Sequence, residues 1–327
     1  MPPNADWEEV AQQRAIDKNT HVSFPQLKYP SLRDDGLRDP VQWLAGKAMD
    51  DGAEGLWRIH DKLYDLTRFI KRHPGGEEWL ELTQGTDITE AFESHHLNPS
   101  TEKILTQYYI RDAKTPRNSP FTFKEDGFYK TLKRAAFEEL KKIPKDASRT
   151  ANNITDGLFL SIFLHQGFFK SHYRWHDAIG LLLPLWMIIA SGAPVLDVIS
   201  MWLWINCTGS LIFFSIAVNA AHHHPDAIKD GDQPASETPD WGMHQVEALL
   251  DRKDVNGNVF AVMTLFGDHC LHHMFPTLDH SVLKYMHPLF IDLCEKYQAN
   301  YRVSTQFKLV LGQIKETMRT EFKTKND

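Results

Sequence analysis

The sequence predicts a small domain of short strands and short helices, followed by a larger, mostly helical part embedded in a membrane. Two observations lead to this fold class. Residues 57–69 alternate between apolar and polar side chains, as a short strand, a turn and a second strand or helix start do. Further on, two uncharged and strongly apolar runs begin at residues 178 and 198, and each is close to the ~20 residues that cross the hydrocarbon core of a bilayer.

The overall composition hides this division. The 327 residues are 42% hydrophobic and 24% charged, which is typical of a soluble globular protein. The net charge of −7 argues against nucleic acid as a partner, because phosphate binding needs a basic surface. Three cysteines without CxxC spacing argue against a disulfide scaffold or a thiolate zinc site. The 17 histidines are the one unusual figure.

The chain divides into five expected segments. These are a polar lead-in at 1–49, a compact mixed domain at 50–112, a linker with a basic amphipathic helix at 113–156, a histidine-bearing region at 157–300 with a membrane hairpin at 178–218, and a tail at 301–327. Residues 191–194 offer a turn inside the hairpin, so both of its ends lie on one side of the bilayer. Lys170 and Arg174 precede it, which places those ends in the cytosol. The alternative is a pair of buried helices in a soluble domain.

Residues 128–142 have the pattern of a basic amphipathic helix. Phe128, Leu132, Ala136 and Leu140 fall on one face, and the basic side chains fall elsewhere. Such a helix either lies on an anionic membrane surface or faces solvent, and the sequence does not separate these interpretations.

Two histidine motifs within residues 50–112 predict a site for a flat ligand. His73 begins a His-Pro-Gly-Gly turn, whose glycines lack a Cβ and let such a ligand approach the backbone. Some two dozen residues later, a short helical stretch ends in His95 and His96. Two histidines on separate helices can clamp a planar macrocycle from both faces. Phe69 and Phe92 would lie near its ring, because each precedes a histidine by four residues.

The whole string from residue 56 to residue 96 resembles a cytochrome b5 domain. The matches are Tyr64-Asp65, Phe69, the His-Pro-Gly-Gly turn, Gly85, Asp87-Ile88-Thr89 and Phe92. The resemblance covers about residues 50–112 and implies an α+β domain that binds haem b through two histidines. It implies His73 as one ligand and His96 as the other, with His95 as the alternative. With both axial positions filled, such a haem transfers electrons and does not itself activate a substrate.

Most of the acidity belongs to this segment. Residues 50–112 hold 7 Lys and Arg against 13 Asp and Glu. The acidic residues that flank the expected haem site are Glu77, Glu78, Glu81, Asp87, Glu90 and Glu93. An acidic rim would steer a basic redox partner, such as a cytochrome b5 reductase, toward the haem, and a merely solvated face is the alternative.

A second group of histidines lies at and beyond the end of the apolar runs. His222 begins a run of three, and His269, His272 and His273 follow later. On a helix the last three share a face, because they are spaced i, i+3 and i+4. Imidazole suits iron and zinc, so the group predicts a metal site unless the histidines are satisfied within a core.

Two strings in this region resemble the membrane fatty acid desaturases. GDHCLHHMFPTLDH is similar to their third histidine box, and VNAAHHHP is similar to the extra motif at the end of the preceding membrane hairpin. The resemblance implies non-haem iron held by His222, His269, His272 and His273, with His223 and His244 as additions. The whole arrangement is similar to the insect cytochrome b5-related proteins, in which a cytochrome b5 domain is fused to a desaturase-like region.

The match to the desaturases is incomplete. They carry two earlier histidine boxes with a first membrane hairpin, whereas only 65 residues, 113–177, separate the haem domain from the hairpin here. His172 and His176 match an HxxxH box literally, but at a place where the family has none, and His165 is a weaker candidate. The sequence therefore predicts an internally shortened desaturase-like region.

Two functions follow from these motifs. One is a membrane-anchored haem electron-transfer protein of lipid metabolism, and the other is an active desaturase or hydroxylase of acyl lipids with a non-haem di-iron centre. The C-terminal Lys323 and Lys325 resemble a dilysine retrieval signal. We therefore expect a protein of the endoplasmic reticulum membrane, with its haem domain and C-terminus in the cytosol.

Overall fold

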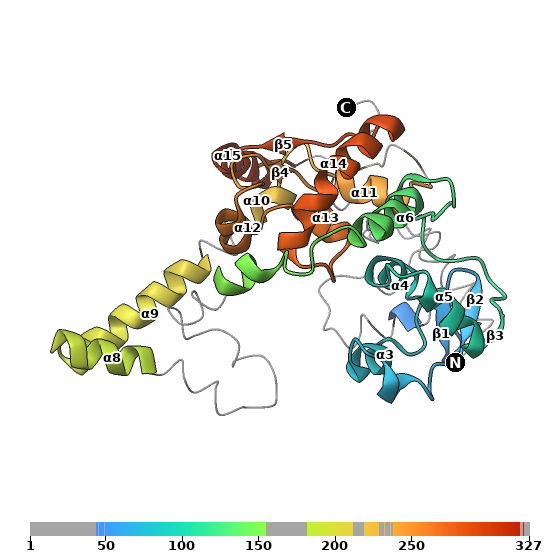
Figure 1. The fold of residues 1–327 in the computed structure, drawn as a ribbon, viewed down its shortest axis with the longest axis horizontal. Coiled ribbons are helices and arrows are strands. Elements are labelled where there is room, and N and C mark those ends of the chain that lie inside the picture. Colours follow the sequence, from blue (N-terminus) through green and yellow to red (C-terminus); the bar gives the residue numbers. More distant parts are fainter. Residues whose placement is uncertain are drawn as a thin grey trace.

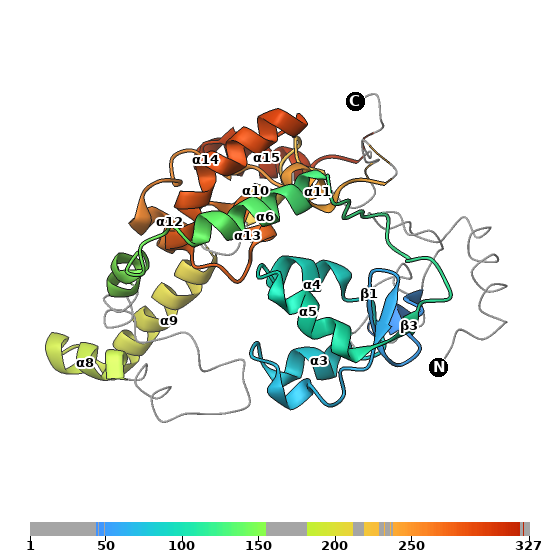
Figure 2. The same cartoon turned by 45° about the vertical axis from the view of Figure 1, so that its right-hand side comes forward.

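The computed structural model describes residues 44, 46–48, 50–154, 182–211, 219–228, 232, 236, 238–320 and 323. These residues form two parts that lie side by side, and a pair of helices projects away from the second part (Figures 1 and 2). The first part contains the expected haem site, and the second contains the second group of histidines.

The first part is built on a three-stranded antiparallel sheet. Its strands are β1 (Trp57–Ile59), β2 (Lys62–Tyr64) and β3 (Tyr109–Asp112), in the order β1-β2-β3. The helices beside it are η1 (Ile70–Arg72), α3 (Glu77–Thr83), α4 (Thr89–His95), α5 (Ser100–Leu105) and η2 (Thr106–Tyr108). Its core consists of Trp57, Ile59, Tyr64, Leu66, Leu80 and Phe92. This mixture of strands and short helices confirms the fold class predicted for residues 50–112.

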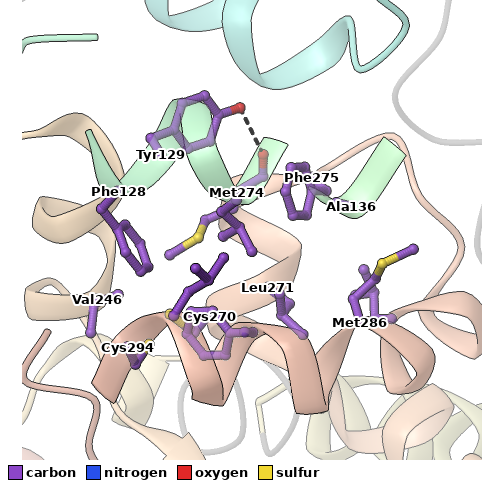
Figure 3. Packing of buried hydrophobic residues seen from close by; sticks show 14 of the residues in the cluster. Phe128, Tyr129, Ala136, Val246, Cys270, Leu271, Met274, Phe275, Met286 and Cys294 are labelled. Atoms are coloured by element: carbon purple, nitrogen blue, oxygen red, sulfur yellow. Dashed lines mark hydrogen bonds between the residues drawn. The ribbon is translucent and has the colours of Figure 1, made fainter. Parts of the chain in front are cut away.

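The second part is helical. Its helices are α6 (Phe128–Leu140), α10 (Asn219–His222), α11 (Trp241–Glu247), α12 (Val259–Leu265), α13 (His269–Met274), α14 (His280–Tyr297) and α15 (Gln306–Thr317). Two short parallel strands, β4 (Asp251–Arg252) and β5 (Val303–Ser304), join the segment before α12 to the segment before α15. The largest core lies where α6, α11, α13 and α14 meet (Figure 3).

Helix α6 buries its apolar side and part of its polar side. Its predicted apolar face is buried in this core, where the ring of Phe128 lies 6.4 Å from that of Phe290 on α14. Lys130 and Lys133, on another side of the helix, are buried as well. The sequence predicted that the polar side of this helix faces either a membrane surface or solvent. Both predictions are wrong for these two lysines.

The buried lysines of α6 meet a carboxylate from the first part. Glu93 of α4 is 1% exposed, and its two carboxylate oxygens lie 2.7 Å from Lys130 Nζ and 2.6 Å from Lys133 Nζ. His60 Nε2 lies 2.7 Å from the same carboxylate. Burial alone would raise the pKa of Glu93, but the hydrogen bond from His60 and the two ammonium groups outweigh it and hold the pKa well below its usual range. The carboxylate is therefore ionised, and it joins the two parts.

Two further side chains join the parts. Arg117, in the predicted linker, donates hydrogen bonds to Asp87 at 2.7 Å and to Glu90 at 2.6 Å. The hydroxyl of Tyr129 lies 3.0 Å from the carbonyl oxygen of Glu93 and 3.3 Å from that of Met274 on α13 (Figure 3). The linker and α6 thus connect the first part to the second covalently, and they also hold the two parts together through polar contacts.

The projecting helices α8 (Leu182–Ser191) and α9 (Val195–Leu211) form a hairpin (Figure 1). The predicted turn is confirmed, since Gly192 has a φ of 60° between the two helices, a conformation that favours glycine. Large apolar side chains cover the outside of the hairpin. They are Leu182, Leu185, Trp186, Ile189, Val195, Leu196, Ile199, Met201, Leu203, Trp204, Ile205 and Leu211.

Among the residues that the structure describes, no helix combines the length and the apolar character needed to cross a bilayer. The predicted hairpin extends at both ends into residues 178–181 and 212–218, which lie outside the described residues. The same holds for His165, His172 and His176.

We expect Glu93→Gln to lower the free energy of unfolding by about 3 kcal/mol or more, because two buried ammonium groups lose the buried carboxylate that they share. Denaturant unfolding followed by circular dichroism measures the change. The matched control is Glu138→Gln, an exposed carboxylate beside Lys141, for which we expect at most about 1 kcal/mol. Equal losses in the two variants would contradict the buried contact.

The contribution of Glu93 should also depend on pH. Because its pKa is depressed in the folded protein, the stabilisation is complete above the ordinary carboxyl pKa of about 4.3 and is lost as the pH falls toward the folded value. The stability difference between the wild type and Glu93→Gln should therefore be constant at neutral pH and shrink only below about pH 4. Unfolding curves across that range measure it, and a difference that is already lost at pH 6 would contradict the assignment.

Candidate functional site

The first part contains a pocket of about 660 Å³ that is partly open to solvent. Its lining consists of Ile59, Leu66, Phe69, His73, Pro74, Leu80, Ile88, Phe92, His96, Thr101, Ile104, Leu105 and Tyr108. The rings of His73 and His96 lie across it from one another, with their centroids 6.1 Å apart. Nearly all other lining side chains are apolar, so the two imidazoles are the natural metal ligands of this pocket.

His73 is held by the turn that follows η1. Its Nδ1 donates a hydrogen bond to the carbonyl oxygen of Gly76 at 2.8 Å, which leaves Nε2 free to bind a metal ion. Gly76 has a φ of 107°, a conformation that favours glycine. A Cβ on Gly75 would lie 2.9 Å from Cε1 of the His73 ring. Both glycines of the motif are therefore needed for the position of this imidazole.

His96 is held in a similar way at the end of α4. Its Nδ1 donates to the carbonyl oxygen of Phe92 at 2.9 Å, and Nε2 is again left free. Burial lowers the pKa of His96, so the ring is a neutral imidazole at pH 7. His95 is exposed, its Nδ1 donates to the carbonyl oxygen of Ala91, and it is not part of the pocket lining. Of the two predicted alternatives, only His96 faces His73.

The two predicted phenylalanines also line the pocket. The Phe69 ring lies 5.9 Å from the His73 ring, and the Phe92 ring lies 4.7 Å from the His96 ring. Two imidazoles that bind one metal ion through bonds of about 2 Å have ring centroids roughly 6 Å apart. The observed separation and the flat apolar walls therefore fit a haem held between His73 and His96.

Half of the carboxylates of the predicted acidic rim are exposed in the structure. Glu77, Glu78 and Glu81 of α3 are exposed, as a docking surface requires. The other three carboxylates, on Asp87, Glu90 and Glu93, are bound by Arg117 and the lysines of α6. They serve the contact between the two parts of this chain and are not available to a separate protein.

The second part contains a cluster of three histidines. One nitrogen of each of His222, His269 and His273 lies within 4.8 Å of the others. The Nε2 atoms of His222 and His269 are 3.2 Å apart, a distance at which two imidazoles need a proton or a metal ion between them. Burial lowers the pKa of all three, that of His273 to about 3, so they are neutral ligands at pH 7.

The surroundings fix these rings. His269 and His273 are four residues apart on α13, and the buried carboxylate of Asp251 accepts hydrogen bonds from the backbone N–H groups of His269 and Cys270 at the start of this helix. Nδ1 of His273 lies 3.1 Å from the side-chain oxygen of Gln245. His222 is hydrogen-bonded to the carbonyl of Ala248. Contacts of this kind orient metal-binding imidazoles.

The other predicted ligands lie elsewhere. The ring of His272 stacks on that of His280 at 4.8 Å, with Phe266 packed against both. His223 is exposed, and His244 packs on Phe121. The structure thus brings together three of the four predicted iron ligands and separates the fourth.

Sequence reasoning did not find several residues that shape these sites. Asp251 and Gln245 lie outside the histidine motif along the chain, and no spacing rule connects them to it. His280 is the last residue of the string that resembles the third histidine box, and its place in that string was the signal available for it.

Comparison with known proteins agrees with this arrangement. Residues 44–114 match the cytochrome b5-like haem/steroid binding domain, and residues 112–305 match the fatty acid desaturase family. The chain belongs to the fatty acid desaturase family and carries a cytochrome b5 domain before it. These two families imply haem as one cofactor and non-haem iron as a candidate for the other.

One relative matches nearly the whole of this desaturase-family chain, and others match a part of it. It is 30% identical over 414 aligned residues to a cytochrome b5-related protein of Drosophila melanogaster, which covers 90% of this chain and 95% of the relative. It is 48% identical over 131 residues to a cytochrome b5-related protein of Drosophila virilis, covering 40% of this chain and 91% of the relative. The mouse cytochrome b5 type B is 47% identical over 66 residues, which cover 20% of this chain and 45% of that protein.

The pocket geometry predicts different effects for adjacent histidines. We expect His96→Ala to abolish the absorption spectrum of a haem with two histidine ligands, because no other described imidazole faces His73. His95→Ala is the matched control and should leave the spectrum unchanged, since His95 points away from the pocket. Absorption spectroscopy of the purified haem-loaded variants measures both. Loss of this spectrum in His95→Ala and its retention in His96→Ala would contradict the assignment of His96 as the second haem ligand.

The second cluster predicts a role for Gln245. We expect Gln245→Leu to weaken metal binding roughly 10- to 100-fold, because His273 loses the acceptor that orients it. Gln245→Glu keeps an acceptor oxygen at the same place and should retain most of the affinity. Competition with a chelator measures both affinities. Equal affinities for the two variants would show that this contact does not orient the ring.

Proposed function

We propose that the protein is a membrane-anchored haem electron-transfer protein of lipid metabolism. The observation that carries this proposal is the pocket in which His73 and His96 face each other with free Nε2 atoms. His73 and His96 would together hold a haem there, and a haem held by two histidines would supply single-electron exchange without offering a substrate a place on its iron. The chain's own part is to orient the two imidazoles through the carbonyls of Gly76 and Phe92 and to exclude water with apolar walls.

The α8–α9 hairpin supports the membrane anchor. Its outer surface consists largely of exposed apolar side chains, among them Trp186, Ile189 and Trp204. So large an exposed apolar surface is typical of a membrane or protein contact. Together with Lys170, Arg174 and the C-terminal lysines, it is consistent with the endoplasmic reticulum membrane and a cytosolic haem domain.

The exposed side of α3 is the proposed contact for a basic reductase. Glu77, Glu78 and Glu81 leave this side negatively charged, and Trp79 among them is exposed and apolar. Leu80, on the opposite side of the same helix, lines the haem pocket. A partner bound to α3 would therefore be close to the haem.

We expect charge reversal of α3, Glu77→Lys with Glu78→Lys and Glu81→Lys, to slow haem reduction by a cytochrome b5 reductase roughly 10-fold or more at low salt. The difference should shrink at high ionic strength, because screening weakens steering between exposed charges. Stopped-flow reduction of the haem measures the rate. The control is Glu138→Lys with Glu139→Lys at the end of α6, and an equal effect there would contradict docking at α3.

An active acyl-lipid desaturase or hydroxylase is the second candidate function. The observation that favours it is the path between the two sites. Tyr129 connects the carbonyl of Glu93, three residues before His96 on α4, with the carbonyl of Met274, the residue after His273 on α13. The haem ligand and the candidate iron ligand are thus linked within one chain by a buried hydroxyl, which suits electron transfer from one centre to the other.

The ligand count favours the electron carrier. Three histidines of the described residues form the cluster, whereas the family's di-iron centre takes a larger set. The alignment with the Drosophila melanogaster relative spans 414 positions and this chain has 327 residues, so it contains positions that this chain lacks. This supports the predicted internal shortening.

Metal content separates the two functions. The purified protein should contain haem iron and no stoichiometric non-haem iron if it is only a carrier. Inductively coupled plasma analysis beside haem quantification gives both values, and lipid analysis of expressing cells gives the activity. Non-haem iron together with a new double bond or hydroxyl in cell lipids would overturn the carrier and establish the enzyme.

A further inference from the structure

Helix α15 carries an exposed apolar stripe that the proposed function does not use. Phe307, Leu311, Ile314 and Met318 follow one another at spacings of four, three and four residues, so they lie on one side of the helix. Phe307 is 70% exposed and Met318 is 68% exposed. A stripe of this size on the outside of a folded protein is typical of a binding surface.

The opposite side of α15 is firmly packed. Leu309 is buried in a small core with Ala220 of α10 and with Leu250. Gly312 lies directly against the ring of His224, and a Cβ at this position would overlap it. The orientation of α15 is therefore fixed, and its apolar stripe faces outward.

Charge on α15 is distributed asymmetrically. Lys308 and Lys315 are exposed and flank the stripe on the same side, because each follows a stripe residue by one position. The acidic side chain within the helix, Glu316, is buried on the opposite side. The exposed surface is thus apolar with a basic edge, which is complementary to anionic phospholipid headgroups above acyl chains.

The position of α15 agrees with a membrane contact. It packs on α10, which follows the apolar hairpin, and residue 211 at the end of α9 is eight positions before residue 219. A chain of this length spans at most roughly 30 Å. The chain connection therefore keeps α10, on which α15 packs, within that distance of the end of α9.

We propose that α15 lies in the interface of an anionic phospholipid bilayer, with Phe307, Leu311, Ile314 and Met318 among the acyl chains and Lys308 and Lys315 at the headgroups. The membrane-surface role that the sequence suggested for residues 128–142 belongs to this helix. The proposal rests on the membrane anchor proposed above, and it adds a second contact that orients the cytosolic part against the bilayer.

The test uses the haem-loaded full chain with Cys207→Ser, which removes the exposed thiol. Nitroxide labels are attached at Leu311→Cys in α15, at Leu203→Cys in α9 and at Glu295→Cys on α14, an exposed position outside the stripe. The protein is reconstituted with phosphatidylcholine vesicles, with and without phosphatidylserine. Electron paramagnetic resonance measures collisions of each label with oxygen, which enriches in lipid, and with a water-soluble nickel complex.

We expect the label at 311 to be shielded from nickel and accessible to oxygen, like the label at 203 and unlike the label at 295. Lys308→Glu with Lys315→Glu should reduce the shielded population at 311 roughly 10-fold or more in phosphatidylserine vesicles, without changing the label at 203 or the haem spectrum. The matched control, Lys284→Glu with Lys296→Glu on α14, should have no effect.

Three outcomes would overturn the proposal. A label at 311 that is freely accessible to nickel while the label at 203 is shielded shows that α15 does not touch the bilayer, although the hairpin does. Nickel access at both positions shows that the membrane anchor itself fails. Shielding at 311 that occurs without vesicles, and only at high protein concentration, shows that a second copy of the chain covers the stripe instead.

Discussion

The carboxylate of Glu93 is the interaction on which the arrangement of this protein depends. It is buried between the two parts and is bound by Lys130, Lys133 and His60. Charges removed from water in this way are stable only when every one of them is paired, so the contact has one geometry and does not slide. Because Glu93 lies on α4, whose C-cap residue is His96, this contact fixes the predicted haem ligand relative to the second group of histidines.

Both sites use the backbone to hold imidazoles in one tautomer. The carbonyls of Gly76 and Phe92 accept the Nδ1 protons of the two pocket histidines, and the carbonyl of Ala248 binds His222 in the same manner. A backbone carbonyl can only accept a hydrogen bond, so in the pocket Nε2 is left for the metal ion. The carbonyl of Phe92 accepts the backbone N–H of His96 as well, so backbone and ring of this ligand are held by one oxygen.

Two places on the molecule combine several exposed apolar side chains along a helix. The α8–α9 hairpin exposes apolar side chains along its whole length, whereas α15 exposes a single stripe and buries its other side. These are the two patterns by which helices contact a bilayer, through the hydrocarbon core and along the interface. The basic helix α6 has neither pattern in the folded protein, because its lysines are neutralised by Glu93.

The sequence by itself determined the features that are local in the chain. The mixed domain at 50–112, the turn at 191–194, His73 and the two phenylalanines follow from motifs within a few residues, where glycine, proline and helical spacing fix the backbone. The tertiary structure decided which histidines meet. His96 rather than His95 faces the pocket, His272 stacks on His280 outside the cluster, and the three carboxylates Asp87, Glu90 and Glu93 turn inward. The partner of His272 is eight residues away but on the next helix, and the partners of His96 and of the carboxylates are farther away in the sequence. Spacing along one helix carries no information about a partner on another element.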